Sequence, residues 1–362
     1  MHFYSAKVYI YFSIATLNRI IKMPARGPRP AMGIATKISH TNKCIFASYA
    51  QSFNSSENGD IEQAIKSIFS ADAKIDAFHP VNETKGAIGY FRDIISPILQ
   101  SFRGFQRRDN IIIGGEYLGG EWVATTGYFL GHFEHTWLGI PPSGKLEHIR
   151  FGEFHRMIDG KIVESQIFLG VAELLIDLGI WPLELMGGYE GVTPGPSTQD
   201  GISITENEPV KSRATADLVE GMLMELTSPD AAWIPYWDER MIWYGPGGFG
   251  SYVTTEAFAA FQVPFENTFE GWGDGVPQGI LGVGSQCKAG DGDYAFLSGW
   301  PQVTGVHVKT FMGIEPTNKR IYMRDCDWWR CKDGKIIENW CMVDTLHLVH
   351  QLGRDILSEI SQ

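Results

Sequence analysis

Apolar residues near the end of the chain follow the two-residue period of strands that bury one face. Residues 320–331 are rich in β-branched and aromatic side chains, and residues 336–343 continue the pattern after Asp333-Gly334. Asp-Gly supplies the positive φ angles of a tight hairpin turn, and residues 299–312 form a third strand before it. These segments predict an antiparallel meander.

Apolar residues recur at helical spacing in the earlier part of each half. In the first half these segments are residues 42–53, 61–69 and 87–102, and in the second half residues 214–226. Helices followed by strands predict an α+β class, in which helices cover one face of a curved, mostly antiparallel sheet. Pro97 lies inside the third helix and is expected to kink it.

The same domain pattern occurs twice. Residues 313–338 match residues 139–164 at a distance of 174 positions, including the Asp-Gly turn. Residues 258–272 match residues 91–105 at a distance of 167 positions. Self-similarity at this spacing predicts two tandem copies of one domain. The two offsets differ by seven residues, which predicts an insertion within Gly273 to Gly284 of the second copy.

The length of 362 residues fits two domains of about 150 residues each, a common domain size. Residues 187–211 are rich in glycine and proline and lack periodicity, which predicts a linker. The first domain is therefore expected over residues 40–186 and the second over residues 212–362.

Residues 1–39 are expected to form a leader outside the fold. No Asp or Glu precedes Glu57, and the apolar run 8–17 is too short to span a bilayer. An organelle-type leader, a weak secretory signal and an over-extended start before Met23 or Met32 all fit this composition. We expect a disordered or non-native segment.

Composition narrows the function classes. Thirty basic residues against 42 acidic ones give a net charge of −12, which argues against binding to a nucleic-acid backbone. The five cysteines are odd in number and include no Cys-x-x-Cys, so reduced thiols in a cytoplasmic protein are expected. Organelle import or secretion is the alternative if the basic leader is real. No membrane partner is expected.

A carboxylate on the predicted strand 320–331 is the first candidate for chemistry. Strand periodicity puts Asp325, Asp327 and Trp329 on one face, while the arginines shared by both copies lie on the opposite, outward face. Burial in an apolar cavity raises the pKa of a carboxyl group, which suits Asp327 to take a proton from carbon. The alternative, that both carboxylates are solvated or bonded to an arginine, stays open.

His307 is the second candidate, because a neighbouring strand would bring it near Asp327 as an acid/base partner. The alternative is a histidine satisfied within the core. His347 and His350 are spaced to bind a metal with Asp344, but no further ligand set is apparent, so no metal is expected.

Three runs in the second half resemble the SnoaL-like polyketide cyclases of the nuclear transport factor 2-like superfamily. They are His307-x-x-x-Phe311-x-Gly313-Ile314-x-Pro316-Thr317, Met323-Arg324-x-x-Asp327-x-Trp329-Arg330 and Asp333-Gly334-Lys335-Ile336-x-Glu338-Asn339-Trp340-x-x-x-Asp344. Trp243-Tyr244-Gly245-Pro246 is also similar to members of this family. The resemblance extends over residues 214–357 and is weaker over residues 42–179.

The resemblance implies two tandem cones, each a strongly bent sheet around a pocket. It implies cofactor-free aldol ring closure with Asp327 as acid/base and His307 as its partner. It also implies a set of substrate-binding residues, namely Trp243, Tyr244, Trp329, Trp340 and Asp344. In the first copy Phe133 replaces His307 and Glu153 replaces Asp327. That copy is therefore expected to be a degenerate partner in an intramolecular pseudo-dimer, with a homo-oligomer as the alternative.

The function expected from these residues is that of a cofactor-independent acid/base enzyme. Its substrate would be a hydrophobic small molecule that bears a carbonyl group, and its reaction a cyclisation, an isomerisation or a lyase step. The alternative from another class is a non-catalytic small-molecule-binding or assembly module on the same fold.

Overall fold

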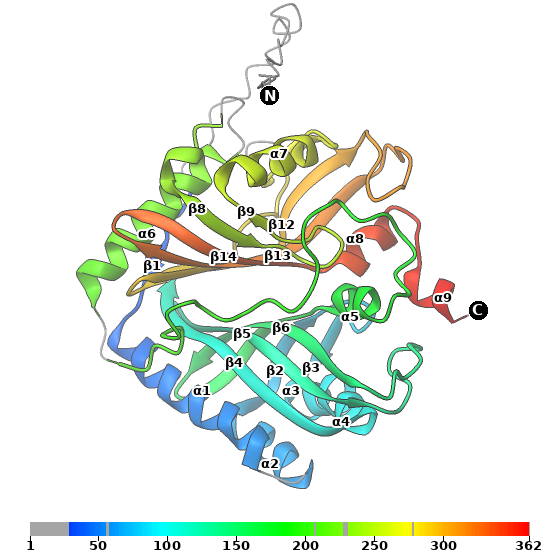
Figure 1. Cartoon of the computed structure of the whole chain (residues 1–362). Coiled ribbons are helices and arrows are strands. Elements are labelled where there is room, and N and C mark those ends of the chain that lie inside the picture. Colours follow the sequence, from blue (N-terminus) through cyan, green and yellow to red (C-terminus); the bar gives the residue numbers. More distant parts are fainter. Residues whose placement is uncertain (1–28, 56–57, 206–207, 227–230, 277–278, 362) are drawn as a thin grey trace, which may run out of the picture.

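The computed structural model describes residues 29–55, 58–205, 208–226, 231–276 and 279–361. Figure 1 shows two sheets stacked face to face, with helices on the outer side of each sheet. Each domain therefore buries one face of its sheet under its own helices and the other face against its neighbour. Among the described residues, no helix is long and apolar enough to cross a bilayer.

The first domain places its helices beside a six-stranded sheet of order β3-β2-β7-β6-β5-β4. Its elements are α1 (Lys37–Ser55), α2 (Asn58–Ile68), β2 (Phe69–Ala77), β3 (Glu83–Lys85), α3 (Gly86–Tyr90), α4 (Ser96–Ser101), β4 (Phe102–Tyr117), β5 (Gly120–Phe133), β6 (Leu146–Ile158), β7 (Lys161–Leu169) and the closing α5 (Val171–Asp177). A π-helical turn, Phe91–Ile95, joins α3 to α4. Pro97 lies in the first turn of α4, directly after this π-helical turn, so the irregular turn falls where the proline was expected to disturb the helix.

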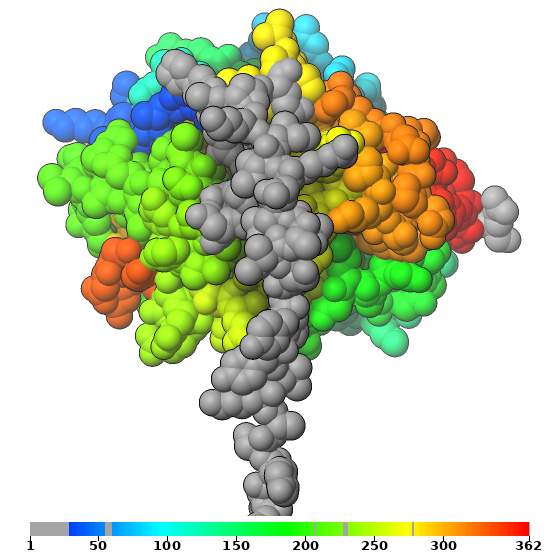
Figure 2. All heavy atoms as spheres, turned by 90° about the horizontal axis from the view of Figure 1, so that it is seen from above, coloured from blue at the N-terminus to red at the C-terminus, as the bar shows by residue number. Residues whose placement is uncertain are grey.

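The second domain repeats this order around the other sheet. Its elements are α6 (Pro209–Glu225), β8 (Trp237–Tyr244), β9 (Tyr252–Val253), α7 (Thr255–Glu266), β10 (Phe269–Gly273), β11 (Cys287–Asp291), β12 (Tyr294–His307), β13 (Arg320–Lys332), β14 (Lys335–Val343), α8 (Thr345–Gln351) and α9 (Ile356–Ile360). Seen from above, second-domain residues coloured light green to orange spread over this face (Figure 2). The α+β class with curved sheets and helices on one face is confirmed.

One edge strand distinguishes the two domains. In the first domain β4 pairs with β5 along its length, from Phe102 opposite Phe133 to Tyr117 opposite Gly120. In the second domain the corresponding strand is split into β10 and β11, both of which pair with β12. The predicted insertion falls in this break, so it interrupts an edge strand that is continuous in the first copy.

The two sheets meet through large side chains. Trp328 of β13 is fully buried and stacks on Phe154 of β6, with ring centroids 4.8 Å apart. Gly152 permits this approach, because a Cβ there would lie 2.7 Å from the Trp328 ring. The face predicted to be outward is therefore covered by the other domain, as the 2% exposure of Arg150 shows. Periodicity identifies a second face but does not reveal what covers it.

Two ion pairs occupy equivalent positions on this face in the two domains. The Arg156 Nε lies 2.9 Å from a Glu164 carboxylate oxygen, and Arg330 pairs in the same way with Glu338.

The start of the described chain corrects the predicted leader. Residues 1–28 lie outside the described residues, but β1 (Gly33–Ile34) pairs in parallel with β11 of the second domain. A Cβ on Gly33 would lie 1.6 Å from the Glu116 carbonyl oxygen, so this strand sits tightly between the two domains. Since α1 already begins at Lys37, residues 29–39 belong to the fold. A segment this short and of mixed polarity carries too little pattern to reveal such a strand.

The interface predicts a large effect of Trp328→Ala. Removing this buried indole leaves a cavity between the sheets and should lower the free energy of unfolding by about 3–5 kcal/mol. Urea denaturation followed by circular dichroism measures the change. Ile158→Ala, at a side chain that is 51% exposed, is the control and should change stability by less than about 0.5 kcal/mol. Equal effects of the two substitutions would contradict a shared core at this interface.

Candidate active site

A cavity of about 120 Å³ lies between the sheet and the helices of the second domain. Its walls are mainly aromatic and aliphatic, from α6, α7 and the inner face of the sheet. The polar side chains that line it are Asp325, Asp327, Asn339, Gln262 and Gln302. An apolar pocket with a few converging polar groups is the usual form of a small-molecule site.

Two carboxylates occupy neighbouring inward positions of β13, Asp325 and Asp327. From the neighbouring strand β14, the Asn339 Nδ2 donates to the Asp327 Oδ1 at 2.9 Å. The same amide nitrogen also donates to the Trp328 carbonyl oxygen at 3.0 Å, which fixes its orientation. The Asp325 Oδ1 is buried and has no hydrogen-bond partner among the described residues.

The environment separates the proton affinities of the two carboxyl groups. Burial raises the pKa of Asp327 to about 6, although hydrogen bonds from Asn339 and Cys341 oppose the shift. Burial and the neighbouring charge of Asp327 raise the pKa of Asp325 well above its ordinary value. Asp327 is therefore the more acidic member of the pair and loses its proton first as pH rises, while Asp325 holds its proton more tightly.

Two indole N–H groups in this cavity have no partner. Trp237 and Trp329 both line it, and the Nε1 atom of each is buried without a hydrogen bond within the described part of the chain. The Oε1 of Gln302 is likewise buried and unpaired there. Because unpaired buried polar atoms are costly, a ligand with an acceptor oxygen near the indoles and a hydroxyl group near Gln302 would gain hydrogen bonds.

Residues 290–352 match the model of the SnoaL-like polyketide cyclase family. The second domain therefore contains a SnoaL-like segment. The matched segment contains β13 and β14, which carry Asp325, Asp327 and Asn339. The predicted resemblance is thus confirmed over the strands that build the cavity, and it indicates a cyclase-like protein in general terms.

Some solved structures are similar to part of this chain at low sequence identity. The proposed hydroxylase AclR from Streptomyces galilaeus is 19% identical, and the alignment covers 39% of this chain and 97% of AclR with a TM-score of 0.32. The proposed polyketide cyclase IdmH from Streptomyces antibioticus is 19% identical over 39% of this chain and 99% of IdmH, with a TM-score of 0.31. No curated protein matches the chain. The family assignment therefore rests on residues 290–352.

The structure divides the predicted substrate-binding residues of the SnoaL-like domain into two groups. Trp243 and Trp329 line the cavity. Tyr244 and Trp340 instead stack on each other at 5.4 Å on the opposite face of the sheet, where the Trp340 Nε1 donates to the Pro194 carbonyl oxygen. The prediction for these two residues is wrong, because a shift of one position along a strand moves a side chain to the other face.

Asp344 lies at the contact between the domains, outside the described cavity wall. It caps α8 by accepting from the His347 N–H at 3.2 Å, and it accepts from the His79 N–H of the first domain at 2.9 Å. The Arg324 Nη1 is 3.0 Å away. Its contacts make it a structural residue of the interface. Within the described residues, no group of His, Cys, Asp or Glu is arranged to hold a metal ion.

The expected approach of His307 to Asp327 is corrected by the strand register. Asp327 lies opposite Leu297 of β12, whereas His307 ends that strand and pairs with Phe269. The His307 Nδ1 accepts from the Thr317 N–H at 3.2 Å. Phe269 lies against the ring of His307 at 5.6 Å, away from the carboxylates. The sequence alone does not determine the register of β12. A bulge between Gly299 and Val303 shifts the pairing of this strand, which moves His307 relative to Asp327.

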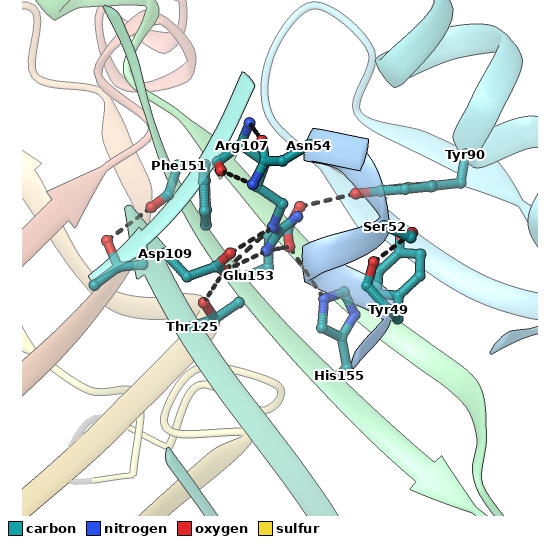
Figure 3. Close-up of polar contacts among 11 residues, drawn as sticks. Tyr49, Ser52, Asn54, Tyr90, Arg107, Asp109, Thr125, Phe151, Glu153 and His155 are labelled. Carbon is teal, nitrogen blue, oxygen red and sulfur yellow. Dashed lines mark hydrogen bonds and ion pairs between the residues drawn. The ribbon is translucent and has the colours of Figure 1, made fainter. Parts of the chain in front are cut away.

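In the first domain the equivalent carboxylate, Glu153, is paired with a buried arginine (Figure 3). Glu153 is fully buried and lies 2.7 Å from the Arg107 Nη2, while the Tyr90 hydroxyl donates to it at 2.8 Å. Burial alone would raise the pKa of Glu153, but Arg107 and His155 outweigh burial and lower that pKa to about 2. Glu153 is therefore a permanently charged partner of a buried arginine.

Arg107 fills the interior that is open in the SnoaL-like domain. Its guanidinium carbon lies 4.4 Å from the centre of the Phe151 ring, and the rings of Phe46, Phe53 and Phe129 surround it at 5.5–5.6 Å. Arg107 belongs to β4. The equivalent position of the second domain lies just after the end of β10, where the edge strand is interrupted. The break in the edge strand thus removes the position from which a cation would reach Asp327.

The buried pair predicts a pH-dependent stability in the first domain. Glu153→Gln should cost about 3–5 kcal/mol near neutral pH, because it leaves part of the Arg107 charge uncompensated. In the wild type this contribution is complete above the ordinary pKa of 4.5 and is lost as pH falls toward about 2, so the variant should be less sensitive over that range. Thermal unfolding at a series of pH values measures both effects.

Glu164→Gln is the matched control, since it breaks the half-exposed pair with Arg156. It should change stability by at most about 1 kcal/mol. If Glu153→Gln were equally mild, the buried network would not be a major contributor to stability.

Proposed function

We propose that the SnoaL-like domain is a cofactor-independent acid/base enzyme. Its substrate is a hydrophobic small molecule with a hydrogen on the carbon next to a carbonyl group, and its reaction is of the polyketide-cyclase type. The observation that carries this proposal is the pair Asp325 and Asp327 in an aromatic cavity, with proton affinities that differ.

Asp327 is the base of the proposed reaction. Its carboxylate is charged near neutral pH, yet it is more basic than an exposed aspartate because it is desolvated. Asn339 donates to its Oδ1 and holds the carboxylate at the cavity wall. An exposed carboxylate is too weak a base for this step at neutral pH, so the apolar wall is part of the catalyst.

Asp325 and Trp329 stabilise the carbonyl oxygen of the same substrate in the proposed reaction. Both lie on the cavity face of β13 together with Asp327, and the indole N–H of Trp329 has no partner in the described chain. As the C–H bond breaks, its electron pair moves toward the carbonyl oxygen, where an N–H and a protonated carboxyl group stabilise the developing charge. These two residues take the role that the sequence assigned to His307.

Cyclisation then follows without any oxidant or reductant. The enolate carbon forms a new C–C bond to a second carbonyl carbon of the same molecule, and the second carbonyl oxygen becomes an alkoxide. That alkoxide takes the proton that Asp327 removed from carbon, which restores the charged Asp327, so atoms and charge balance over the turnover. Trp243 and Trp329 exclude water from the enolate.

A non-catalytic binding or assembly module is the second candidate. It is favoured by the first domain, where the same fold holds a filled interior and packs against its neighbour. The two candidates differ in whether bound ligand exchanges carbon-bound hydrogen with solvent.

Hydrogen exchange in deuterated water tests the proposal. The probe is 2-tetralone, a neutral bicyclic ketone, and mass spectrometry follows its deuterium content. We expect the wild type to accelerate exchange and Asp327→Asn to reduce the enzymatic rate by about 10²–10⁴-fold, the usual contribution of a general base. Asp333→Asn in the exposed hairpin turn is the matched control and should exchange at the wild-type rate. Binding of the ketone without exchange by the wild type would favour the binding module.

The pH dependence of exchange is a separate prediction. Activity should rise as pH increases through about 6, because Asp327 must lose its proton before it can accept one from carbon. At higher pH it should fall again when Asp325 ionises, and Asp325→Asn should abolish that fall. Initial exchange rates in a constant-ionic-strength buffer series measure the profile. A flat profile across this range would contradict the assigned roles.

A further inference from the structure

A second, outer cavity of about 320 Å³ adjoins the one that holds the carboxylates. The two share six wall residues, namely Leu223, Leu226, Trp272, Leu297, Gln302 and Val303. Asp325 and Asp327 line the inner cavity, while the outer cavity reaches the segment inserted between β10 and β11. The inner chamber therefore borders a larger outer chamber.

Three parts of the chain build the outer chamber. Arg29 and Pro30 come from the segment before β1, Tyr117 and Leu118 from the β4–β5 turn of the first domain, and the remaining wall from the SnoaL-like domain. The contact is close, because a Cβ on Gly115 would lie 2.3 Å from the Ala289 Cβ. The outer chamber is thus incomplete without the first domain.

The charges of the outer chamber are already paired within the protein. The Arg29 Nη2 lies 2.8 Å from the Asp274 Oδ2, and the Lys288 Nζ lies 2.8 Å from a Glu220 carboxylate oxygen. Lys288 also lies 5.8 Å from the centre of the Tyr117 ring. Since these pairs compensate each other, the described wall of the chamber carries no net charge that would favour an ionic ligand.

Uncharged polar groups remain where the two chambers join. Gln302 lines both, and its Oε1 is buried without a partner among the described residues. Its Nε2 lies 3.3 Å from the Ser285 Oγ. A free amide oxygen accepts a hydrogen bond from a hydroxyl group, which places a neutral hydroxyl-bearing segment at this junction.

We infer that the outer chamber binds the non-reacting part of an elongated, neutral ketone whose enolisable end reaches the inner chamber. The first domain then acts in substrate recognition through Tyr117 and Leu118, although its own interior is filled. This inference rests on the proposed function only for the chemistry at the inner end. The length selectivity is a property of binding and is measured without turnover.

Prodan and Laurdan test the inference in the full-length protein. They are neutral acylnaphthalene ketones with one fluorophore, and they carry a propionyl or a dodecanoyl chain. Leu118→Trp places a larger side chain at the outer chamber, at a residue that is 71% exposed. We expect it to weaken Laurdan by at least about tenfold, because the long chain loses buried apolar contact, and to leave Prodan within about twofold. Fluorescence titration measures both dissociation constants.

Leu146→Trp is the matched control, because Leu146 is also exposed in the first domain but lies away from either chamber. It should leave both ligands unchanged. Leu118→Gly is a second variant that the positive φ of 51° at this position accommodates without strain. It removes apolar contact without filling the chamber and should weaken Laurdan by about threefold.

An equal effect of Leu118→Trp on both ligands, or no effect on either, overturns the inference. Exchange of 2-tetralone in the same variant separates this outcome from the proposed function. Normal exchange with unchanged Laurdan binding refutes the outer subsite alone. If Leu118→Trp weakens Laurdan but not Prodan, and neither the wild type nor the variant exchanges the hydrogen of 2-tetralone, the subsite is supported and the catalytic role is refuted.

Discussion

A carboxylate enclosed by aromatic side chains must either find a cation or hold a proton more tightly, because charge is poorly stabilised away from water. The two domains of this chain adopt the two solutions. Glu153 lies beside Arg107, which lowers its pKa, whereas Asp327 has an amide neighbour and a raised pKa. One interior is thereby filled and rigid, and the other stays open and basic.

The break between β10 and β11 connects this difference to the backbone. A continuous β4 carries Arg107 into the first interior, while the interrupted strand leaves the second interior without that side chain. The same interruption forms part of the wall of the outer chamber. An insertion in an edge strand can therefore create both the space and the electrostatics of a site.

The first domain packs directly against the sheet of the second domain. Trp328 and Phe154 stack across the interface, and the linker and the β1 strand cross it as well. The helices α1, α2, α6 and α7 lie on the outer sides of the two sheets (Figure 1), whereas α5 and α8 contact each other between the domains. Because the β4–β5 turn reaches the outer chamber, loss of the first domain would change the ligand site as well as the stability.

The sequence by itself determined the duplication, the order of helices and strands, the site of the insertion and the inward direction of Asp325, Asp327 and Trp329. Those features are local, since a period, a turn dipeptide or an internal match lies within one stretch of chain. The pairing of His307, the burial of Tyr244 and Trp340, and the partner of Asp344 were decided only by the tertiary structure. Strand register and the packing of one sheet on another join distant segments, and no local pattern records which residue lies opposite.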